Sequence, residues 1–357
     1  MEHFVVSARK YRPQTFKDVV GQQAITNTLL NAIEHNHLAQ ALLFTGPRGV
    51  GKTTCARILA KMINSEGNES VDEDFAFNIF ELDAASNNSV DDIRSLTDQV
   101  RIPPQVGKYK VYIIDEVHML SASAFNAFLK TLEEPPKHCI FILATTEKHK
   151  ILPTILSRCQ IFDFNRITIE DSVKHLQYVG ESEGVKIEEE GLTVISQKAD
   201  GAMRDALSIL DKIVSFSNGA LTYENTLEHL NILDEAYFFK LLDHLTKQDL
   251  TQAMLLYDEI NQKGFEGDMV LYGLASFIRN LLVCKDPASA KLLESIEGWR
   301  EQYISVAKEI TTPYLVSALN LLNEAEIQFK MARNKRLHVE MAIIKLNFLQ
   351  QAIELSM

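Results

Sequence analysis

One glycine-rich octapeptide has the residue types that hold a chain of phosphates. The sequence "GPRGVGKT", residues 46–53, fits G-x-x-x-x-G-K-[ST], follows the apolar run "ALLF" and precedes a segment with helical spacing. Its glycines let backbone N–H groups approach phosphate oxygens, and the helix N-terminus adds positive charge. Lys52 would reach the β- and γ-phosphates, and the Thr53 hydroxyl would ligate Mg²⁺. The alternatives are a strand–helix turn that binds nothing and, for Thr54, either an α-phosphate contact or an ordinary helix position.

Two adjacent carboxylates follow another apolar run. In "VYIIDEVH", residues 111–118, Asp115 would hold Mg²⁺ directly or through water, and Glu116 would orient and deprotonate an attacking water. The alternative is that the two acids cap the next helix. A general base next to the carboxylate that holds the metal suits water as the nucleophile. Asp115 and Glu116 together therefore favour hydrolysis of a nucleotide over transfer of its phosphoryl group to a second substrate.

Four later residues have side chains that could contact a phosphate, although the sequence alone does not place them in the site. Thr145 and Thr146 end the apolar run "CIFILATT", where a hydroxyl can bond the γ-phosphate or the attacking water, or can be an ordinary β-branched strand residue. Arg158, in "SRC", lies too far along the chain to belong clearly to the same site. Arg204 begins the helical segment "RDALSILDK" and could reach back to a phosphate, or form a surface pair with its neighbouring aspartate.

The elements that must position these residues alternate over the first 166 residues. Short apolar runs rich in Ile, Val, Leu and Phe predict buried parallel strands at 41–46, 77–84, 110–117 and 139–146. Helical spacing lies between them, at 52–63, 90–100 and 122–134. This alternation predicts a parallel sheet with helices on both faces.

The pattern changes near Ile167, where strand signals disappear. The segments 191–216 and 236–357 predict successive amphipathic helices. Turn-forming residues separate them at 216–225, 261–268, 284–289 and 310–313. The predicted fold class is therefore α/β followed by all-α.

Composition sets limits on the class of protein. The 357 residues are 46% apolar and 24% charged, as in soluble globular chains of two or three domains, and no apolar run has the length of a membrane span or a signal-peptide core. Four scattered cysteines without a CxxC pair argue against a zinc site and disulfides, and fit a reducing cytoplasm. A net charge of −12 argues against a uniformly basic nucleic-acid surface, although a local basic patch is compatible with it.

The ordered series of motifs resembles the ATP-hydrolysing γ/τ subunit of the bacterial sliding-clamp loader, an AAA+ family. The resemblance covers residues 1 to about 215, and the later helices match by position and length only. The motifs that carry it are "ARKYRPQTFKDVVGQ", "GPRGVGKT", "ELDAASNNSVDDIR", "IIDEVHMLS", "FNAFLKTLEEPP", "LATTE", "LSRCQ" and "GAMRDALS".

The resemblance implies three domains and gives each ambiguous residue a role. It implies a P-loop ATPase domain (1–166), a small helical lid domain (167–228) and a C-terminal helical collar (229–357). Thr146 takes the first sensor position, Arg204 the second sensor position, and Arg158 the arginine finger that completes a neighbouring subunit's site. These join Lys52, Asp115 and Glu116 as catalytic residues. The implied ATP-binding residues are Ala8, Arg9, Tyr11, Arg12, Pro13, Val19 and Val20 at the adenine and ribose, and Gly46, Pro47, Arg48, Gly49, Val50, Gly51, Lys52, Thr53, Thr54 and Arg204 at the phosphates.

The resemblance also implies partners. Subunits of this kind would form an open hetero-pentameric ring with two relatives, use ATP and Mg²⁺ to open the sliding clamp on primer–template DNA, and release both on hydrolysis. Single-stranded DNA-binding protein is a further candidate partner. Backbone contacts to DNA would come from 87–94, Arg94, Arg101 and 107–110, where the alternative is solvated surface charge.

One segment departs from the family. Members usually carry a four-cysteine zinc module where this chain has the acidic, cysteine-free residues 64–77, so we expect no zinc site.

The alternative function is an AAA+ branch-migration or unwinding motor, which would append a DNA-binding domain in place of a collar. A non-hydrolysing structural subunit of the loader would lack the intact P-loop. The sequence leaves open a γ-like or a longer τ-like full-length chain.

Overall fold

The chain forms two compact units in the computed structural model. The structure describes residues 6–65, 78–105, 107–217, 219–286, 288–293 and 297–356. The units comprise residues 1–221 and 222–357. Among the described residues, no helix combines the length and the hydropathy that a membrane crossing requires. The domain boundaries at 166/167 and 228/229 stay predictions.

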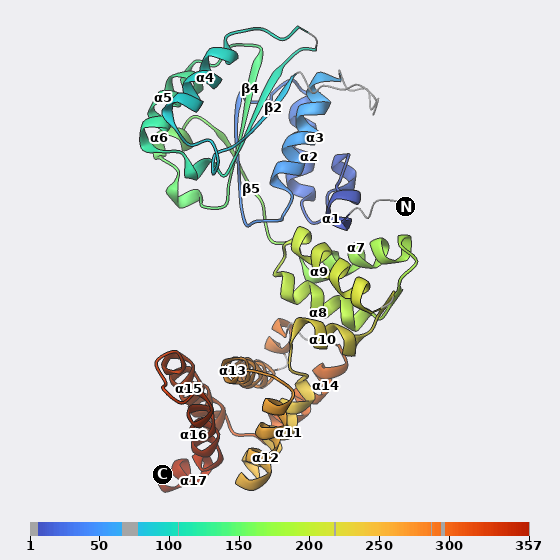
Figure 1. Ribbon diagram of the computed structural model, residues 1–357, viewed down its shortest axis with the longest axis vertical. Helices are drawn as coiled ribbons and strands as arrows, with labels where there is room; N and C mark the ends of the chain where they lie inside the picture. The colour runs from blue at the N-terminus through green and yellow to red at the C-terminus, as the bar shows by residue number, and fades with distance from the viewer. Residues whose placement is uncertain are drawn as a thin grey trace. The chain divides into compact units, whose positions relative to one another are not determined.

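A five-stranded parallel sheet forms the centre of the first unit (Figure 1). Its order is β2-β3-β4-β1-β5, with β1 (Ala41–Thr45), β2 (Ile79–Asp83), β3 (Lys110–Asp115), β4 (Cys139–Thr145) and β5 (Gln160–Asp163). The predicted parallel sheet is confirmed, although residue 77 of the second predicted strand lies outside the described residues. The sequence did not predict β5, because its four residues are too few to show a pattern of their own and are fixed by pairing with β1.

Helices cover both faces of this sheet, as predicted. Successive strand residues point to opposite faces, so Leu42 and Phe44 join a core with α2 (Gln23–Glu34) and α3 (Lys52–Asn64). On the other face, Leu43 packs in a core with α4 (Val90–Val100), α5 (Ala122–Glu133) and α6 (Pro153–Leu156). Burial on both faces explains why β1, β4 and the middle of β3 are continuously apolar.

The rest of the first unit is mainly helical. It contains α7 (Ile169–Ser182), α8 (Glu189–Ala199) and α9 (Met203–Phe216), joined by the parallel pair β6 (Lys186–Ile187) and β7 (Ala220–Leu221). The sequence after Ile167 gave no strand signal for this pair. Two-residue strands carry no periodic signal, and their pairing depends on a tertiary contact.

A short N-terminal helix, α1 (Ser7–Lys10), packs against α9. The buried Ser7 donates to the Asp211 carboxylate from its backbone nitrogen at 2.7 Å and also from its hydroxyl. The last residue of α1 is tied to the residue that follows α7 as well, since Lys10 Nζ lies 2.6 Å from Glu183 Oε1. These contacts hold the segment that follows α1 beside the helical part of the unit.

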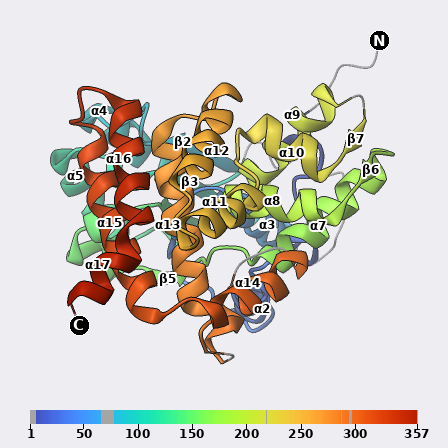
Figure 2. The same cartoon turned by 90° about the horizontal axis from the view of Figure 1, so that it is seen from below.

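The second unit consists of helices, and those after α10 pack around one apolar core. They are α10 (Tyr223–Leu230), α11 (Glu235–Thr246), α12 (Leu250–Gln262), α13 (Gly267–Val283), α14 (Glu297–Glu309), α15 (Thr312–Phe329), α16 (Lys335–Asn347) and α17 (Leu349–Ser356). Figure 2 shows α15 and α16 side by side. The core includes an aromatic cluster in which the centre of the Phe239 ring lies 4.7 Å from the centre of the Phe277 ring and 5.0 Å from that of Tyr303.

Replacing Phe128 tests the packing of α5 on the sheet. Phe128 is fully buried and its ring meets that of Phe141 edge-on at 5.2 Å. Phe128→Ala should lower the free energy of unfolding by about 3–5 kcal/mol in urea denaturation, because it leaves a cavity. Leu255→Ala, at a residue that is 58% exposed, is the control and should change the free energy of unfolding by about 0.5 kcal/mol or less. Equal effects of the two variants would contradict the packing role of Phe128.

Candidate active site

The P-loop lies at the carboxyl end of β1, and two of its glycines are required by geometry. Gly46 has φ +140°, and a Cβ there would lie 2.3 Å from the carbonyl oxygen of Phe164. Gly51 has φ +103° and precedes the first residue of α3. Both positions exclude ordinary side chains, so the sequence pattern reflects a backbone that must turn tightly from strand to helix.

Lys52 is the first residue of α3 and its side chain turns back along the loop. The residue is 6% exposed, and Nζ donates to the carbonyl oxygens of Gly46 and Pro47 at 2.7 and 2.6 Å. Burial lowers the pKa of Lys52 from its ordinary value, and the nearby carboxylates of Glu116 and Asp115 oppose that shift. An anionic ligand in the loop would further stabilise the charged amine.

Thr53 and Asp115 meet although they come from different elements. Thr53 Oγ1 donates to Asp115 Oδ2 at 2.7 Å, and the other carboxylate oxygen accepts the backbone N–H of Glu116 at 2.9 Å. Asp115 ends β3, whose carboxyl end lies at the same sheet edge as the P-loop. A hydroxyl and a carboxylate oxygen side by side are ligands that suit Mg²⁺.

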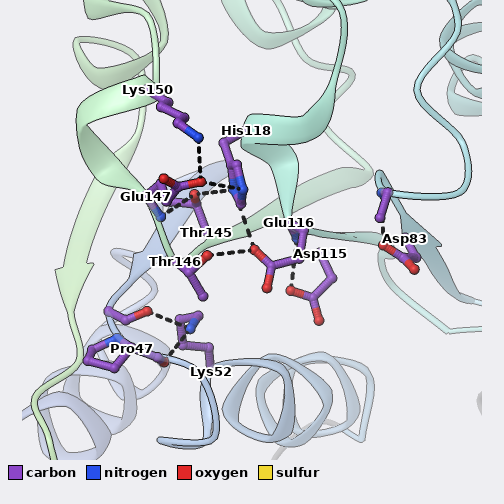
Figure 3. A network of polar contacts seen from close by, with 12 residues as sticks. Pro47, Lys52, Asp83, Asp115, Glu116, His118, Thr145, Thr146, Glu147 and Lys150 are labelled. Atoms are coloured by element: carbon purple, nitrogen blue, oxygen red, sulfur yellow. Dashed lines mark hydrogen bonds and ion pairs between the residues drawn. The ribbon is translucent and has the colours of Figure 1, made fainter. Parts of the chain in front are cut away.

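Glu116 is held in an unusual conformation beside Thr146. It has φ +48°, in the left-handed region that non-glycine residues rarely adopt, and strain of this kind often marks functional sites. Thr146 Oγ1 donates to Glu116 Oε2 at 3.0 Å, as Figure 3 shows. The sheet therefore joins the acidic pair after β3 to the hydroxyl after β4.

A cavity of about 200 Å³ adjoins these residues. Its walls come from the P-loop, the segment after α1, and helices α7 and α9. The predicted residues that line it are Ala8, Tyr11, Arg12, Pro13, Val19, Val20, Arg48, Gly49, Val50, Gly51, Lys52, Thr53, Thr54, Asp115, Glu116 and Arg204. The predicted residues Arg9, Gly46, Pro47, Thr146 and Arg158 are outside this lining.

Four lining residues were missed from the sequence: Ile167, His175, Met203 and Leu207. A signal existed for two of them, because Leu207 lies three residues after Arg204 and four after Met203 on the same helix, spacings that make side chains neighbours on the helix surface. For His175 on α7 there was no signal, since its place in the wall depends on how α7 packs. Burial lowers the pKa of His175, which favours the neutral imidazole.

Positive side chains gather at the cavity. The pKa of Arg12 is lowered by burial first, and then by the positive charges of Arg57 and Arg204. Arg57 is neutralised by Glu81, with two nitrogen–oxygen distances of 2.5 Å. Arg12 and Arg204 both line the cavity and repel each other, and a polyanion bound there would relieve this repulsion.

Arg158 has a partner on its own chain. Its guanidinium lies 2.6 Å from Glu133 Oε1 on α5, and its side chain is 32% exposed.

The predicted DNA-contacting residues Arg94 and Arg101 are exposed, and their role stays a prediction. Most of the segment expected to replace a zinc module, residues 66–77, lies outside the described residues. Elsewhere in the described chain, no group of three or more His, Cys, Asp or Glu side chains could hold a metal ion.

The sheet and site together define a class of protein. A P-loop between β1 and α3, an acidic pair after β3, and the helical region α7–α9 are the features of an AAA+ P-loop ATPase. A solved structure with this fold is the Thermotoga maritima RuvB Holliday junction branch migration motor, with a TM-score of 0.50 and 22% identity. The match covers 66% of this chain and 79% of that chain.

Sequence comparisons give the family. Residues 21–168 match DNA polymerase III, delta subunit; 172–219 match the ATPase lid domain of the DNA polymerase III clamp loader subunit; and 221–355 match domain III of DNA polymerase III subunits gamma and tau. DNA polymerase III subunit tau of Bacillus subtilis is 42% identical over 95% of this chain and 62% of its own length. DNA polymerase III subunit gamma of Buchnera aphidicola from Acyrthosiphon pisum is 32% identical over 96% of this chain and 98% of its own. The chain belongs to the gamma/tau family of DNA polymerase III subunits, the ATPases of the clamp loader, and the predicted resemblance is confirmed.

Replacing Lys52 tests the P-loop. Lys52→Ala should abolish ATP hydrolysis and weaken ATP binding, because it removes the charge expected at the β- and γ-phosphates. Lys61→Ala, at an exposed position on the same helix, is the matched control and should behave as the unaltered chain. Calorimetric titration with ATP and a phosphate-release assay measure the two effects. Normal turnover by Lys52→Ala would contradict the role of the loop.

Proposed function

We propose that this chain binds ATP with Mg²⁺ in the described cavity and hydrolyses it to drive the loading of a sliding clamp onto primer–template DNA. The observation that carries the proposal is the meeting of Thr53, Asp115, Glu116 and Thr146 at one sheet edge, next to Lys52. AAA+ ATPases use a nucleotide, usually with Mg²⁺, and the residues gathered here have the chemistry for both.

Each residue at this edge has a distinct task. Lys52 would exchange its two carbonyl partners for phosphate oxygens, and Thr53 with Asp115 would hold Mg²⁺, which neutralises phosphate charge when bound. Glu116 would orient the attacking water and accept its proton. Thr146, which donates to Glu116, would hold that carboxylate in place.

The adenine end of the cavity is coupled to the helical region. Tyr11 and Arg12 line the cavity just after α1, and α1 is fixed to α9 through Ser7 and Asp211. The same helix α9 places Arg204 in the cavity wall. A nucleotide that contacts both sides would therefore set the position of α9, which supports a second sensor role for Arg204.

Arg158 would act on the site of a neighbouring subunit. It is partly exposed, lies outside the lining of its own cavity, and is paired with Glu133. When a neighbour's γ-phosphate approached, the guanidinium would exchange this carboxylate for the phosphate and stabilise charge in the transition state.

The second unit would hold the subunits together as a collar. Apolar side chains are exposed on and between α15 and α16, as expected of a surface that packs against other chains; they are Ile327, Met331, Leu337 and Met341. The proposed partners are two related subunits, the sliding clamp and primer–template DNA. A motor function is not favoured, because residues 221–355 match a gamma/tau domain and the RuvB likeness concerns the fold alone.

Stimulation of the ATPase tests the clamp-loading function. The chain, assembled with its proposed partner subunits, should hydrolyse ATP slowly alone and much faster when primed DNA and clamp are both present. Primed DNA without clamp, and clamp without DNA, are the controls in a steady-state phosphate-release assay. Full stimulation by single-stranded or branched DNA alone would favour the motor instead.

Mixing two defective chains tests Arg158. Arg158→Ala should keep ATP affinity and assembly but lose stimulated hydrolysis, since arginine fingers contribute about 10³–10⁵ in rate. Mixed rings of Lys52→Ala and Arg158→Ala chains should regain partial activity, because an intact P-loop then faces an intact finger. The control pairs Lys52→Ala with the Lys52→Ala, Arg158→Ala double variant, which has no intact P-loop. No recovery in rings shown to be mixed would contradict a role between subunits.

A further inference from the structure

A buried histidine lies between Glu116 and the segment that leads to Arg158. His118, on the 3₁₀ helix η3 (Val117–Met119), has a side chain that is 6% exposed. Its Nε2 lies 3.0 Å from Glu147 Oε2, and its Nδ1 lies 2.9 Å from Thr145 Oγ1. Figure 3 shows the ring between the carboxylates of Glu116 and Glu147.

Hydrogen-bond roles fix the orientation of this ring. The Glu147 carboxylate only accepts, so His118 Nε2 carries the proton that it receives. Thr145 Oγ1 accepts the backbone N–H of Glu147 at 3.0 Å, and its own proton is then directed at His118 Nδ1. The three residues form a closed ring of matched donors and acceptors that holds the imidazole rigidly.

The opposite edge of the imidazole faces Glu116. Nδ1 lies 3.4 Å from Glu116 Oε2, the oxygen to which Thr146 Oγ1 donates. Since Nδ1 accepts the Thr145 proton, it has none to donate to Glu116, and its contact with this carboxylate is steric. The ring edge therefore limits how far the carboxylate can move away from the Thr146 hydroxyl, on a backbone that is already fixed at φ +48°. Removing the imidazole would leave Thr146 to hold the carboxylate without this second contact.

The other side of the ring is tied to a segment that continues to Arg158. Glu147 Oε2 lies 2.7 Å from Lys150 Nζ, across the 3₁₀ helix η4 (Lys148–Lys150). This helix leads through Ile151 to α6, and Arg158 follows α6 by two residues. A displacement of this segment at a subunit contact would therefore act on Glu147 first and on the ring next.

We infer that His118 is a positioning residue for Glu116, and that its bond to Glu147 links the placement of the catalytic carboxylate to the segment carrying Arg158. The inference rests on the proposed function, in which Glu116 activates water. His118 would not touch the nucleotide, so its loss should slow hydrolysis without weakening ATP binding.

The experiment measures kcat and KM for ATP in the assembled loader with primed DNA and clamp. His118→Ala should lower kcat by about 10- to 100-fold, the usual effect of losing a residue that orients a catalytic group, and leave KM unchanged. His118→Gln, which can still donate to Glu147, should recover part of the rate. His149→Ala is the matched control, because His149 is 76% exposed and its Nε2 lies 3.8 Å from the same Glu147 carboxylate; it should keep the normal rate.

A second position separates positioning from folding. Glu147 is only partly buried, so Glu147→Gln should fold normally, with an unchanged unfolding midpoint, and should also lower kcat. If the two residues act as one link, the His118→Ala, Glu147→Gln double variant should be no slower than His118→Ala alone.

Three results would overturn the inference: a normal kcat in His118→Ala, a rise in KM that accounts for its loss of activity, or losses in the double variant that multiply. Glu116→Gln, assayed in parallel, keeps the two hypotheses apart. If Glu116→Gln stops hydrolysis while the His118 and Glu147 variants are normal, only the role of His118 is wrong. If Glu116→Gln hydrolyses ATP at the normal rate, the proposed water-activating role fails as well.

Discussion

Parallel pairing of β1, β3 and β4 is the constraint on which the site depends. Thr45 of β1 pairs with Thr145 of β4, and Ile114 of β3 pairs with Leu143 of β4. These registers bring the residues that follow each strand to one edge, where Glu116 and Thr146 are in hydrogen-bonding distance. A shift of one residue would send alternate side chains to the opposite face and exchange the two cores, so burial on both faces enforces the register.

Charge at this edge is arranged for a ligand that is both anionic and metal-bound. The loop's own carbonyl oxygens hold Lys52, and a threonine hydroxyl donates to the Asp115 carboxylate. Each contact satisfies a polar group in the free chain and can be exchanged for a phosphate oxygen or a metal ion. The protein thus keeps its buried charges paired without filling the cavity.

Two sets of contacts extend from the cavity. On one side, Ser7 and Asp211 tie the segment after α1 to α9. On the other, His118 and Glu147 connect the acidic pair to the segment before Arg158. The proposals for Arg204, Arg158 and His118 follow from these connections, because each extends a change at the nucleotide to a different part of the unit.

The sequence by itself determined the features in which the residues that act together are neighbours in the chain. The P-loop at 46–53 and the acidic pair Asp115–Glu116 depend on local backbone geometry and chemical type, and the parallel sheet follows from continuous apolar runs between helices. The tertiary structure alone decided the pairing of β5 with β1 and of β6 with β7, the places of Ile167 and His175 in the cavity wall, and the place of His118 between two glutamates. These depend on packing between segments far apart in sequence, and no local pattern encodes the distance between a histidine after one strand and a carboxylate after the next.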